Sequence, residues 1–408
     1  MSVTTRARRP GYLAVLGVPE FRAVFAAHLL STLGVVVCEI ALSVLVYQRT
    51  GSPLLSALTF ALGLLPYAFG GLVLSAVADR FPARRVLVTC DLLCACLAAG
   101  LLLPGLPVAA LLTLRCGLAA IAPVFAGTRG ATLGDVVGTG ELFTFGNSVL
   151  RVTSQSAQLG GFAAGGLLVA AVEPRAVLGL TVGTFLLSAL LLGAGTRPRP
   201  ARTAGGPPLL TAGLSAAREL FADRRIRAVL LLAWVPPLFV VVSEALLTPY
   251  VAGLGRGPDA LGLLMCGMPI GAIGGSLLFG TLLRHRTRVA LSLPIALLAT
   301  LPPLGYLAHP DVGWALLCQI GIGCGIVYTF GVDQWFLDAV PERLRGGAMT
   351  LLIAGTMTTQ GIGMTLAGVA AEFLPVHHVI AGGGIVALFS VALVVVLFVR
   401  TGQSRDSA

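Results

Sequence analysis

The sequence contains no lysine: all 27 of its basic side chains are arginines. Without lysine there is no Walker A loop, in which a lysine reaches the phosphates of a bound nucleotide. A Schiff-base lysine is absent as well, which excludes retinal and pyridoxal-phosphate proteins. Charged residues of either sign make up only 11% of the chain, whereas soluble domains carry about 25%. A water-soluble enzyme of 408 residues is therefore excluded.

Hydrophobic residues, by contrast, make up 56% of the chain. A helix needs about 20 apolar residues to cross a bilayer, and stretches of this length recur between short polar clusters. The sequence predicts an all-α integral membrane protein whose many glycines allow close helix packing. The twelve predicted transmembrane helices cover 21–47, 53–78, 86–103, 107–128, 142–172, 176–195, 228–250, 258–283, 288–308, 312–336, 344–372 and 378–400.

The arginines are distributed unevenly between the two predicted faces of the membrane. With both termini in the cytoplasm, 22 arginines fall in cytoplasmic segments, whereas only Arg49, Arg175 and Arg256 fall outside. This bias satisfies the positive-inside rule. Topology and attraction to anionic lipid account for the net charge of +10, so no nucleic-acid partner is indicated. An arginine-only composition rich in Ala, Gly and Leu is typical of GC-rich bacterial genomes. We therefore expect a multi-pass protein of the bacterial inner membrane.

A polar stretch divides the predicted spans into six and six. It runs from Thr196 to Arg227 and is rich in proline, glycine and arginine. This composition favours a cytoplasmic linker over a packed core. We predict a first six-helix bundle over 1–195, a linker over 196–227, and a second six-helix bundle over 228–408.

The two predicted bundles resemble each other in sequence. Phe21-Arg22-Ala23-Val24 is matched by Ile226-Arg227-Ala228-Val229 at an offset of 205 residues. Such matches at a nearly constant offset indicate an internal duplication. Two repeated six-span units with a binding site between them are typical of alternating-access transporters. Further matches are Glu39 with Glu244 at 205, Arg85 with Arg288 at 203, and Gly161 with Gly363 at 202.

The loop after the second span, Gly71-Leu-Val-Leu-Ser-Ala-Val-Ala-Asp79-Arg80-Phe-Pro-Ala-Arg84-Arg85, resembles the signature loop of the major facilitator superfamily. An ordinary positive-inside loop is the alternative, but topology requires no carboxylate at a helix end. An aspartate between arginines can form charge-assisted hydrogen bonds that lock two helix ends together. We expect Asp79, Arg80, Arg84 and Arg85 to form a cytoplasmic gate.

Further strings are similar to the branch of that superfamily that contains the proton-coupled macrolide exporters and the enterobactin exporter. They are Tyr47-Gln-Arg-Thr-Gly51-Ser52, Ala78-Asp79-Arg80 and Val340-Pro341-Glu342-Arg343-Leu344-Arg345-Gly346. The resemblance implies two pseudo-symmetric six-helix bundles around a central cavity lined by helices 1, 4, 7 and 10. It implies efflux of a drug, antibiotic or siderophore-like compound, driven by a proton gradient without a cofactor. Uptake or facilitated diffusion of a metabolite by the same fold is the alternative. We expect a monomer.

The fifth predicted span departs from the pattern of the family. Exporters of the superfamily typically carry Gly-Pro-x-x-Gly-Gly there. This chain keeps Gly161, Gly165 and Gly166 but has Phe162 in the place of the proline. A helix without that proline should be straighter, which weakens the inference of antiport from this motif.

Ionisable side chains within the spans are candidate functional residues, because a charge at bilayer depth costs roughly 2.5 kcal/mol or more. Under the family's helix order, Glu39, Arg115, Glu244 and Asp333 lie one on each cavity helix. Glu39 and Arg115 each lie eight residues, or about 12 Å, from the predicted external edge. We expect these two side chains to pair, with Glu244 nearby.

Three roles are open for this group. Glu39 and Arg115 form a purely structural ion pair, or Glu39 is a proton site controlled by Arg115 and by desolvation. In the third interpretation, Glu39 or Glu244 binds a cationic group of the substrate directly. Asp333 lies nearer the cytoplasm and is alternatively a gate residue. Asp91, Arg129 and Arg151 are interpreted as structural partners of Asp79.

No enzymatic or metal chemistry is predicted. The chain has no His-Glu-x-x-His, Gly-x-Ser-x-Gly or Gly-x-Gly-Asp string, so it lacks the motifs of intramembrane hydrolases. The cysteines at 90, 94 and 96 are interpreted as small buried hydrophobes, because no histidine or carboxylate set completes a metal site.

Overall fold

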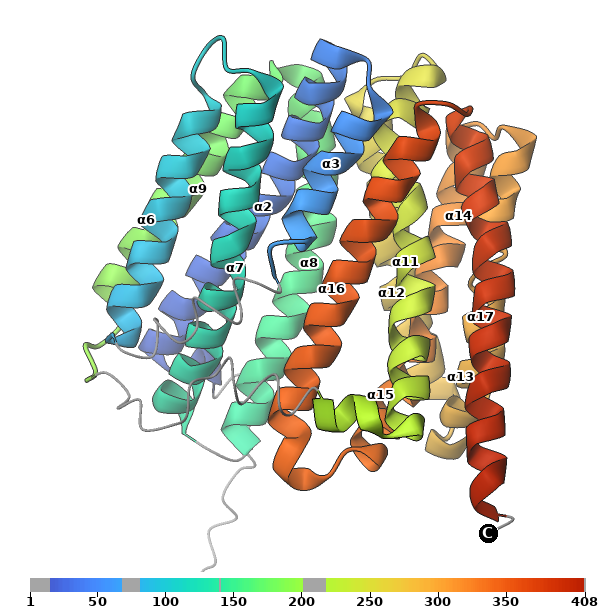
Figure 1. Cartoon of the computed structure of the whole chain (residues 1–408). Helices are drawn as coiled ribbons and strands as arrows, with labels where there is room; N and C mark the ends of the chain where they lie inside the picture. The colour runs from blue at the N-terminus through green and yellow to red at the C-terminus, as the bar shows by residue number, and fades with distance from the viewer. Residues whose placement is uncertain (1–14, 68–80, 139–140, 201–217, 407–408) are drawn as a thin grey trace, which may run out of the picture.

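A computed structural model of the chain describes residues 15–67, 81–138, 141–200 and 218–406. Its described residues form helices and connecting turns, without strands (Figure 1). The helices of the first half are α2 (Pro19–Thr50), α3 (Pro53–Leu64), α6 (Ala83–Leu101), α7 (Val108–Val137), α8 (Glu141–Ala171) and α9 (Pro174–Gly195). Those of the second half are α11 (Arg224–Gly253), α12 (Pro258–Leu282), α13 (His285–Leu298), η2 (Pro302–Ala308), α14 (Val312–Gly325), η3 (Ile326–Tyr328), α15 (Thr329–Ala339), η4 (Glu342–Leu344), α16 (Arg345–Ala371) and α17 (Val376–Asp406).

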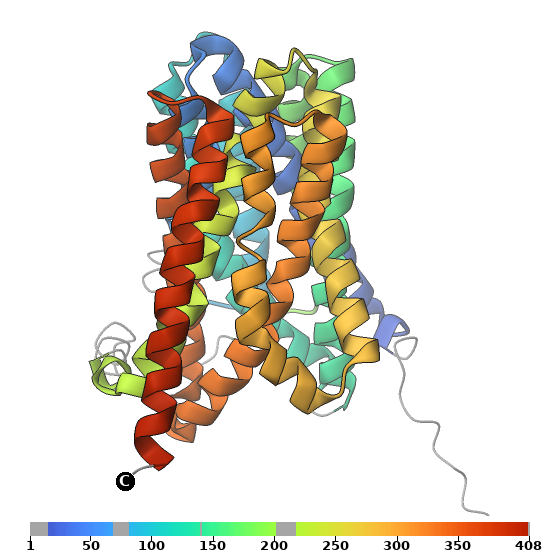
Figure 2. The same cartoon turned by 90° about the vertical axis from the view of Figure 1, so that its right-hand side faces the viewer.

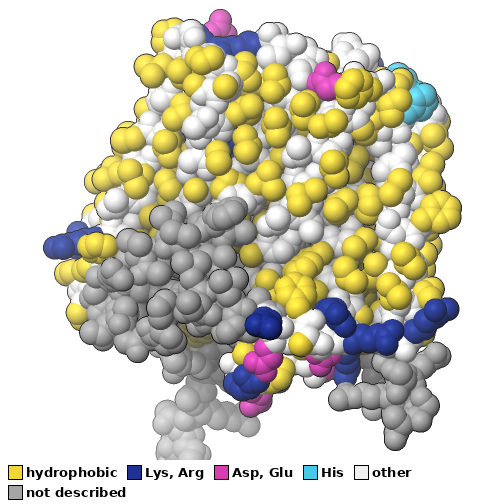
Figure 3. Space-filling view, viewed as in Figure 1, with side chains coloured by type: hydrophobic (Ala, Val, Ile, Leu, Met, Phe, Trp, Pro, Cys, Tyr) yellow, Lys and Arg dark blue, Asp and Glu magenta, His cyan; other side chains and the backbone are white. Residues whose placement is uncertain are grey.

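The all-α membrane fold predicted from the hydrophobic stretches is confirmed, and the helices coincide with the predicted spans. Among the described residues, eight helical segments are long and apolar enough to cross a membrane. The second predicted span continues from α3 into 68–80, which lies outside the described residues. The tenth is divided, because the 3₁₀ turn η3 separates α14 from α15. Hydrophobic side chains cover the middle of the molecular surface, while charged side chains lie mainly towards its two ends (Figure 3).

Proline, glycine and aspartate mark many helix ends. Pro53 and Pro258 occupy the first turns of α3 and α12, where the missing N–H needs no partner. Gly51 ends α2 with a left-handed φ of 64°, which glycine adopts without steric cost. Asp223 caps α11 by accepting the backbone N–H groups of Arg225 and Ile226. Helix α11 therefore begins inside the stretch predicted as a linker, and residues 218–222 are helical as well.

Each half has a densely packed set of helices (Figures 1 and 2). In the first half, α2 packs on α8 and α9, and α6 packs on α7 and α9. In the second half, α11 packs on α16 and α17, and α12 packs on α14. The long apolar helices α2 and α11, which occupy equivalent places in the predicted repeat, thus lie at the centre of their halves.

The two halves meet along what we call the seam, where α8 packs on α12 and α3 packs on α16. At Gly166 of α8, an added Cβ would lie 2.5 Å from the Cα of Gly262. At Gly368 of α16, an added Cβ would lie 3.0 Å from the Cα of Leu54. Gly166 and Gly368 are equivalent in the repeat at an offset of 202. Equivalent glycines of the two repeats therefore allow close approach to the opposite half on both sides of the molecule.

The seam also contains a contact between equivalent residues. Ser43 of α2 and Thr248 of α11 are separated by 205 positions in the sequence, the offset of the repeat, and their hydroxyl oxygens lie 3.0 Å apart. Two equivalent residues can contact each other only near the axis that relates their halves. The centre of the molecule at this depth therefore lies between α2 and α11.

Candidate functional site

An ion pair lies within the hydrophobic first half of the chain. Arg115 of α7 donates from Nη2 to the Oε1 of Glu39 on α2. The Arg115 side chain is 4% exposed and that of Glu39 is 20% exposed. Arg115 also donates from Nε to the backbone carbonyl oxygen of Thr59 on α3, at 3.2 Å. The guanidinium thus joins three helices, and the carboxylate at its end retains some access to solvent.

Gly63 of α3 makes room for this ion pair, and the sequence reasoning did not single it out. An added Cβ at Gly63 would collide with Nη2 of Arg115 and would lie 3.1 Å from Oε1 of Glu39. The available signal was a glycine on the predicted second span, opposite the two charged residues. In a chain with 52 glycines that signal is weak.

Glu244 of α11 brings a second carboxylate to the same place from the other half. Its side chain is half-buried, and it lies close enough to Glu39 for the two carboxylates to repel each other. Glu39 and Glu244 are equivalent in the repeat at an offset of 205. The site therefore combines one arginine with two acids near the central axis.

Asp333, the fourth predicted cavity residue, lies on α15, beyond the 3₁₀ turn η3, and it is exposed. It interacts electrostatically with Tyr328 of that turn. The contacts described above group Glu39 with Arg115 and Glu244.

Comparison with known proteins decides the family. The family model described as "Major Facilitator Superfamily" matches residues 24–334. The chain belongs to this superfamily. It is 25% identical over 358 residues to "Multidrug efflux pump Tap" of Mycolicibacterium fortuitum, covering 82% of this chain and 84% of that protein.

Solved structures of the superfamily's fold are also similar to this chain. The POT family transporter PepTSo matches with a TM-score of 0.75 at 11% identity, covering 95% of this chain and 99% of that one. The nucleoside transporter NupG matches with a TM-score of 0.70 at 15% identity, covering 93% and 98%. This superfamily member is a multi-pass membrane transporter of small molecules and not an enzyme.

The signature loop of the superfamily is only partly described. Asp79 and Arg80 lie outside the described residues. Arg84, at the start of α6, donates from Nη2 to the backbone carbonyl of Gly193 at the end of α9. A cation at the C-terminal carbonyls of a helix is favourable. Arg85 is exposed. The described part of the loop therefore joins two helix ends within the first half.

The glycine motif on α8 has two separate contacts. A Cβ on Gly161 would lie 2.8 Å from Val36 Cγ1, and one on Gly165 would lie 3.0 Å from Ile40 Cδ1, so both glycines accommodate α2. Gly166 accommodates α12 across the seam. Phe162 is buried, and α8 runs without interruption from Glu141 to Ala171.

Asp91 lies among hydroxyl groups, while Asp79, with which it was interpreted as a structural partner, lies outside the described residues. The Asp91 carboxylate accepts hydrogen bonds from Ser31 and Ser188. Arg129 instead contacts Nδ1 of His28 and lies 5.8 Å from the ring centroid of Phe125. The side chain of Arg151 is outside the described part of the chain.

Three histidines meet at the predicted extracellular end. The ring centroids of His309 and His377 are 4.5 Å apart, and those of His377 and His378 are 4.2 Å apart. The sequence reasoning did not foresee this contact, because two separate segments supply the rings. Within the described residues, no group of three or more His, Cys, Asp or Glu side chains is arranged to hold a metal ion.

Proposed function

We propose that this transporter exports a hydrophobic or amphipathic small molecule in exchange for protons, by alternating access. The observation that carries the proposal is the Glu39–Arg115 ion pair, faced by Glu244 from the opposite half. A carboxylate held beside a permanent cation, at the place where two halves meet, can couple its own protonation to the separation of those halves.

Protonation of Glu39 changes two interactions at once. It removes the attraction between Glu39 and Arg115, and it removes the repulsion between Glu39 and Glu244. Arg115 stays attached to the first half through the carbonyl of Thr59, so its guanidinium becomes free to meet substrate. A cationic substrate competes instead for the two carboxylates. In either case proton and substrate exclude each other, which is the requirement for exchange.

The closed seam supports an assignment of state. Ser52, Leu54, Gly166 and Gly368 make their contacts with the opposite half at the predicted extracellular end. With both termini cytoplasmic, a seam closed at the extracellular end corresponds to a state that opens towards the cytoplasm. Asp79, Arg80, Arg84 and Arg85 are proposed to form the gate at that end, with Asp333 as a further gate residue.

The distant relative favours export. "Multidrug efflux pump Tap" names an exporter of many compounds, whereas the peptide and nucleoside transporters share only the fold at 11% and 15% identity. We propose that a monomer works in the bacterial inner membrane and uses the proton gradient in place of a cofactor. The glycine motif on α8 is proposed to serve this exchange.

Efflux of a fluorescent amphipathic dye from cells that lack their own pumps tests the proposal. We expect the wild type to lower dye retention and a protonophore to abolish that effect. Glu39→Gln, which keeps a hydrogen-bond acceptor for Arg115, should be expressed normally and should not pump. Glu342→Gln removes an exposed carboxylate elsewhere and serves as the control.

Two outcomes would contradict parts of the proposal. Normal pumping by Glu39→Gln would make the ion pair structural and would leave Glu244 or Asp333 as the proton carrier. Accumulation of dye in place of loss would reverse the direction and favour uptake.

A further inference from the structure

A cluster of oxygen atoms lies inside the first half, away from the seam. The Asp91 carboxylate of α6 accepts from Ser31 Oγ of α2 at 3.1 Å and from Ser188 Oγ of α9 at 2.5 Å. The two serine oxygens are 2.9 Å apart, and Ser188 Oγ is 3.2 Å from the backbone oxygen of Ala27. Three helices thus bring five oxygen atoms together, which we call the oxygen cluster.

The oxygen cluster has fewer protons than contacts. Four oxygen–oxygen contacts of 2.5–3.2 Å join its atoms. A serine hydroxyl supplies one hydrogen, whereas a carboxylate and a carbonyl supply none. Ser31 and Ser188 therefore donate to two of the contacts at a time. The remaining oxygen lone pairs are available to a cation.

The oxygen cluster also lacks a balancing charge. Asp91 is 1% exposed, and a bare carboxylate at this depth is costly. Within the described residues, no arginine or histidine lies within ion-pair distance of it. Titratable groups that lie near it or line the adjoining cavity include Cys90 and Cys94 of α6, His28 of α2, and Arg115 and Arg129 of α7. Arg115 is paired with Glu39, and Arg129 contacts His28.

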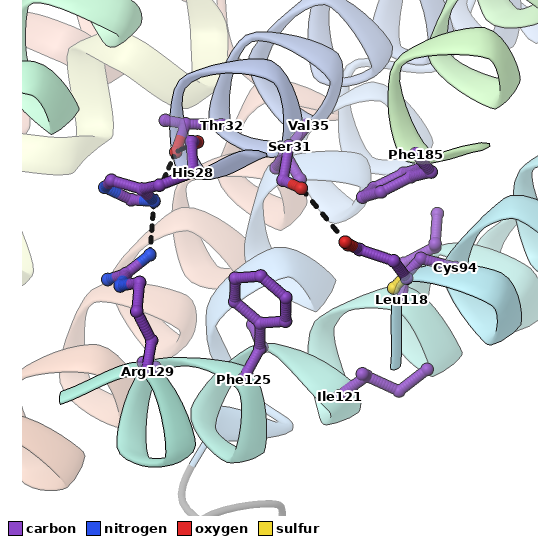
Figure 4. A pocket seen from close by; sticks show the side chains of 13 residues that line it. His28, Ser31, Thr32, Val35, Cys94, Leu118, Ile121, Phe125, Arg129 and Phe185 are labelled. Carbon is purple, nitrogen blue, oxygen red and sulfur yellow. Dashed lines mark hydrogen bonds between the residues drawn. The ribbon is translucent and has the colours of Figure 1, made fainter. Parts of the chain in front are cut away.

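A cavity of about 190 Å³ gives access to the oxygen cluster from within the first half. Asp91 is among its lining residues. Ser31, which donates to Asp91, lies at one side of it, and His28 and Arg129 lie at the other, with Phe125 between them (Figure 4). A space of this size holds several water molecules. An ion that leaves or enters the oxygen cluster can therefore exchange its hydration shell there.

The internal repeat shows that the fold itself does not require these oxygens. At an offset of 205, Ser31 corresponds to Pro236, and at 203, Asp91 corresponds to Pro294. Helices α11 and α13 form in the second half with prolines at these positions. The oxygen cluster is thus a feature of the first half alone.

We propose that Asp91, Ser31, Ser188 and the Ala27 carbonyl form a binding site for one small monovalent cation, either H⁺ or Na⁺, separate from the Glu39–Arg115 pair. One carboxylate balances one positive charge. Hard oxygen ligands suit a proton or a small hard cation and do not suit a transition metal. Because the ligands come from α2, α6 and α9, bound cation holds these three helices together.

The Na⁺ arm of the test uses the purified full-length protein in lipid nanodiscs. The midpoint of thermal unfolding is measured while NaCl replaces KCl or choline chloride at constant ionic strength. A bound cation stabilises the folded state in proportion to its occupancy, so the midpoint should rise with Na⁺ and not with K⁺. Asp91→Asn should abolish this rise, and Ser188→Ala should reduce it.

Thr181→Val is the matched control for Ser188→Ala. Thr181 is buried on the same helix α9 and donates to the carbonyl of Gly34 on α2 at 3.2 Å. The control therefore loses a buried interhelical hydrogen bond without touching the oxygen cluster. It should lower the midpoint and keep the Na⁺-dependent rise.

The H⁺ arm compares the infrared spectrum of the wild type with that of Asp91→Asn. If the cation is a proton, Na⁺ will leave the midpoint unchanged, and the spectrum will contain the carbonyl band of a protonated carboxyl group that Asp91→Asn removes. Absence of both the Na⁺ effect and an Asp91-dependent band would overturn the proposal. Glu39→Gln should keep whichever signal the wild type gives. The result is therefore independent of whether that variant transports.

Discussion

The seam contains a half-buried carboxylate, that of Glu39, and the interior of the first half contains a buried one, that of Asp91; the two are stabilised in different ways. At the seam, Glu39 is paired with Arg115, a cation that never leaves the protein. In the interior, Asp91 is surrounded by the hydroxyls of Ser31 and Ser188. The interactions of a carboxylate paired with a fixed arginine change when the neighbouring helices move. A carboxylate that is surrounded only by hydroxyl groups is able to bind a mobile cation. The first arrangement suits a surface that opens, and the second suits a unit that stays closed.

The packing of the two regions follows the same division. Across the seam, Gly166 and Gly262 place two helix backbones in direct contact. Inside the first half, α8 meets α2 with Gly161 and Gly165 against the side chains of Val36 and Ile40. Backbone contact without interlocking side chains can form and separate with little repacking. In the proposed alternating access, the contact between Gly166 and Gly262 is therefore where the halves would separate.

Replacement of Arg115 by an uncharged residue should have the largest effect on stability and efflux. Arg115→Met leaves Glu39 as a buried carboxylate without its partner, and breaking such a pair costs roughly 3 kcal/mol or more. We expect a large fall in the midpoint of thermal unfolding and complete loss of dye efflux. Differential scanning fluorimetry and the efflux assay measure the two effects.

The double variant Glu39→Gln/Arg115→Met separates charge from structure. With both charges gone, the midpoint should return close to that of the wild type, while efflux should remain absent. If Arg115→Met is as stable as the wild type, the ion pair makes no net contribution to the free energy of unfolding. The electrostatic distinction between the seam and the interior would then be wrong.

A methyl group placed in the seam should have the next largest effect. In Gly166→Ala the new Cβ meets the backbone of α12, which cannot turn aside as a side chain can. Overpacking of this kind costs about 1–3 kcal/mol, so we expect efflux to fall roughly tenfold or more. Gly160→Ala lies on the same helix with nothing within 4 Å of the added Cβ, and it should pump normally. Equal activity of the two variants would show that the seam tolerates wider separation.

The sequence predicted the depth of residues better than their direction. Counting residues along each span placed Glu39 and Arg115 at one level, and their ion pair is present. Asp91 was interpreted as a structural partner of Asp79 because it lies near the cytoplasmic end of its predicted span. Which way α6 is rotated decides that it meets Ser31 and Ser188. The hydrophobic pattern of a membrane helix does not reveal which face meets which neighbour, because apolar faces point to lipid as well as to protein.

Contacts between side chains and the backbone could not be predicted from the sequence either. Arg115 donates to the carbonyl of Thr59, and every residue has a carbonyl, so no residue type marks the acceptor. Gly63 matters because the absence of a side chain leaves room for the ion pair, and a sequence alone does not show which glycine faces such a pair. Asp79 of the signature loop, by contrast, was found by resemblance and lies outside the described residues.

The smallest predicted effect concerns a helix cap shared between the halves. Ser52 caps α3 by accepting from the N–H of Leu55 at 3.1 Å. Its hydroxyl donates to Oε1 of Glu372, which also accepts from the N–H of Leu54 at 3.0 Å. Glu372 stands at the C-terminal end of α16, where a negative charge is unfavourable for its own helix. The same charge is favourable at the N-terminus of α3. Glu372 therefore stabilises contact between the halves at the expense of its own helix.

Replacing this carboxylate should loosen the predicted extracellular end without unfolding either half. Loss of a cap costs about 1 kcal/mol, so Glu372→Gln should increase the open population about fivefold. Spin labels on Leu103→Cys and Arg256→Cys in a cysteine-free background, one on each half, report this as a longer distance in pulsed EPR. Asp311→Ala removes a cap that accepts from Trp314 N at 3.0 Å within the second half alone. It should cost similar stability and leave the distance unchanged. An unchanged distance in Glu372→Gln would mean that glycine contacts alone hold the seam closed.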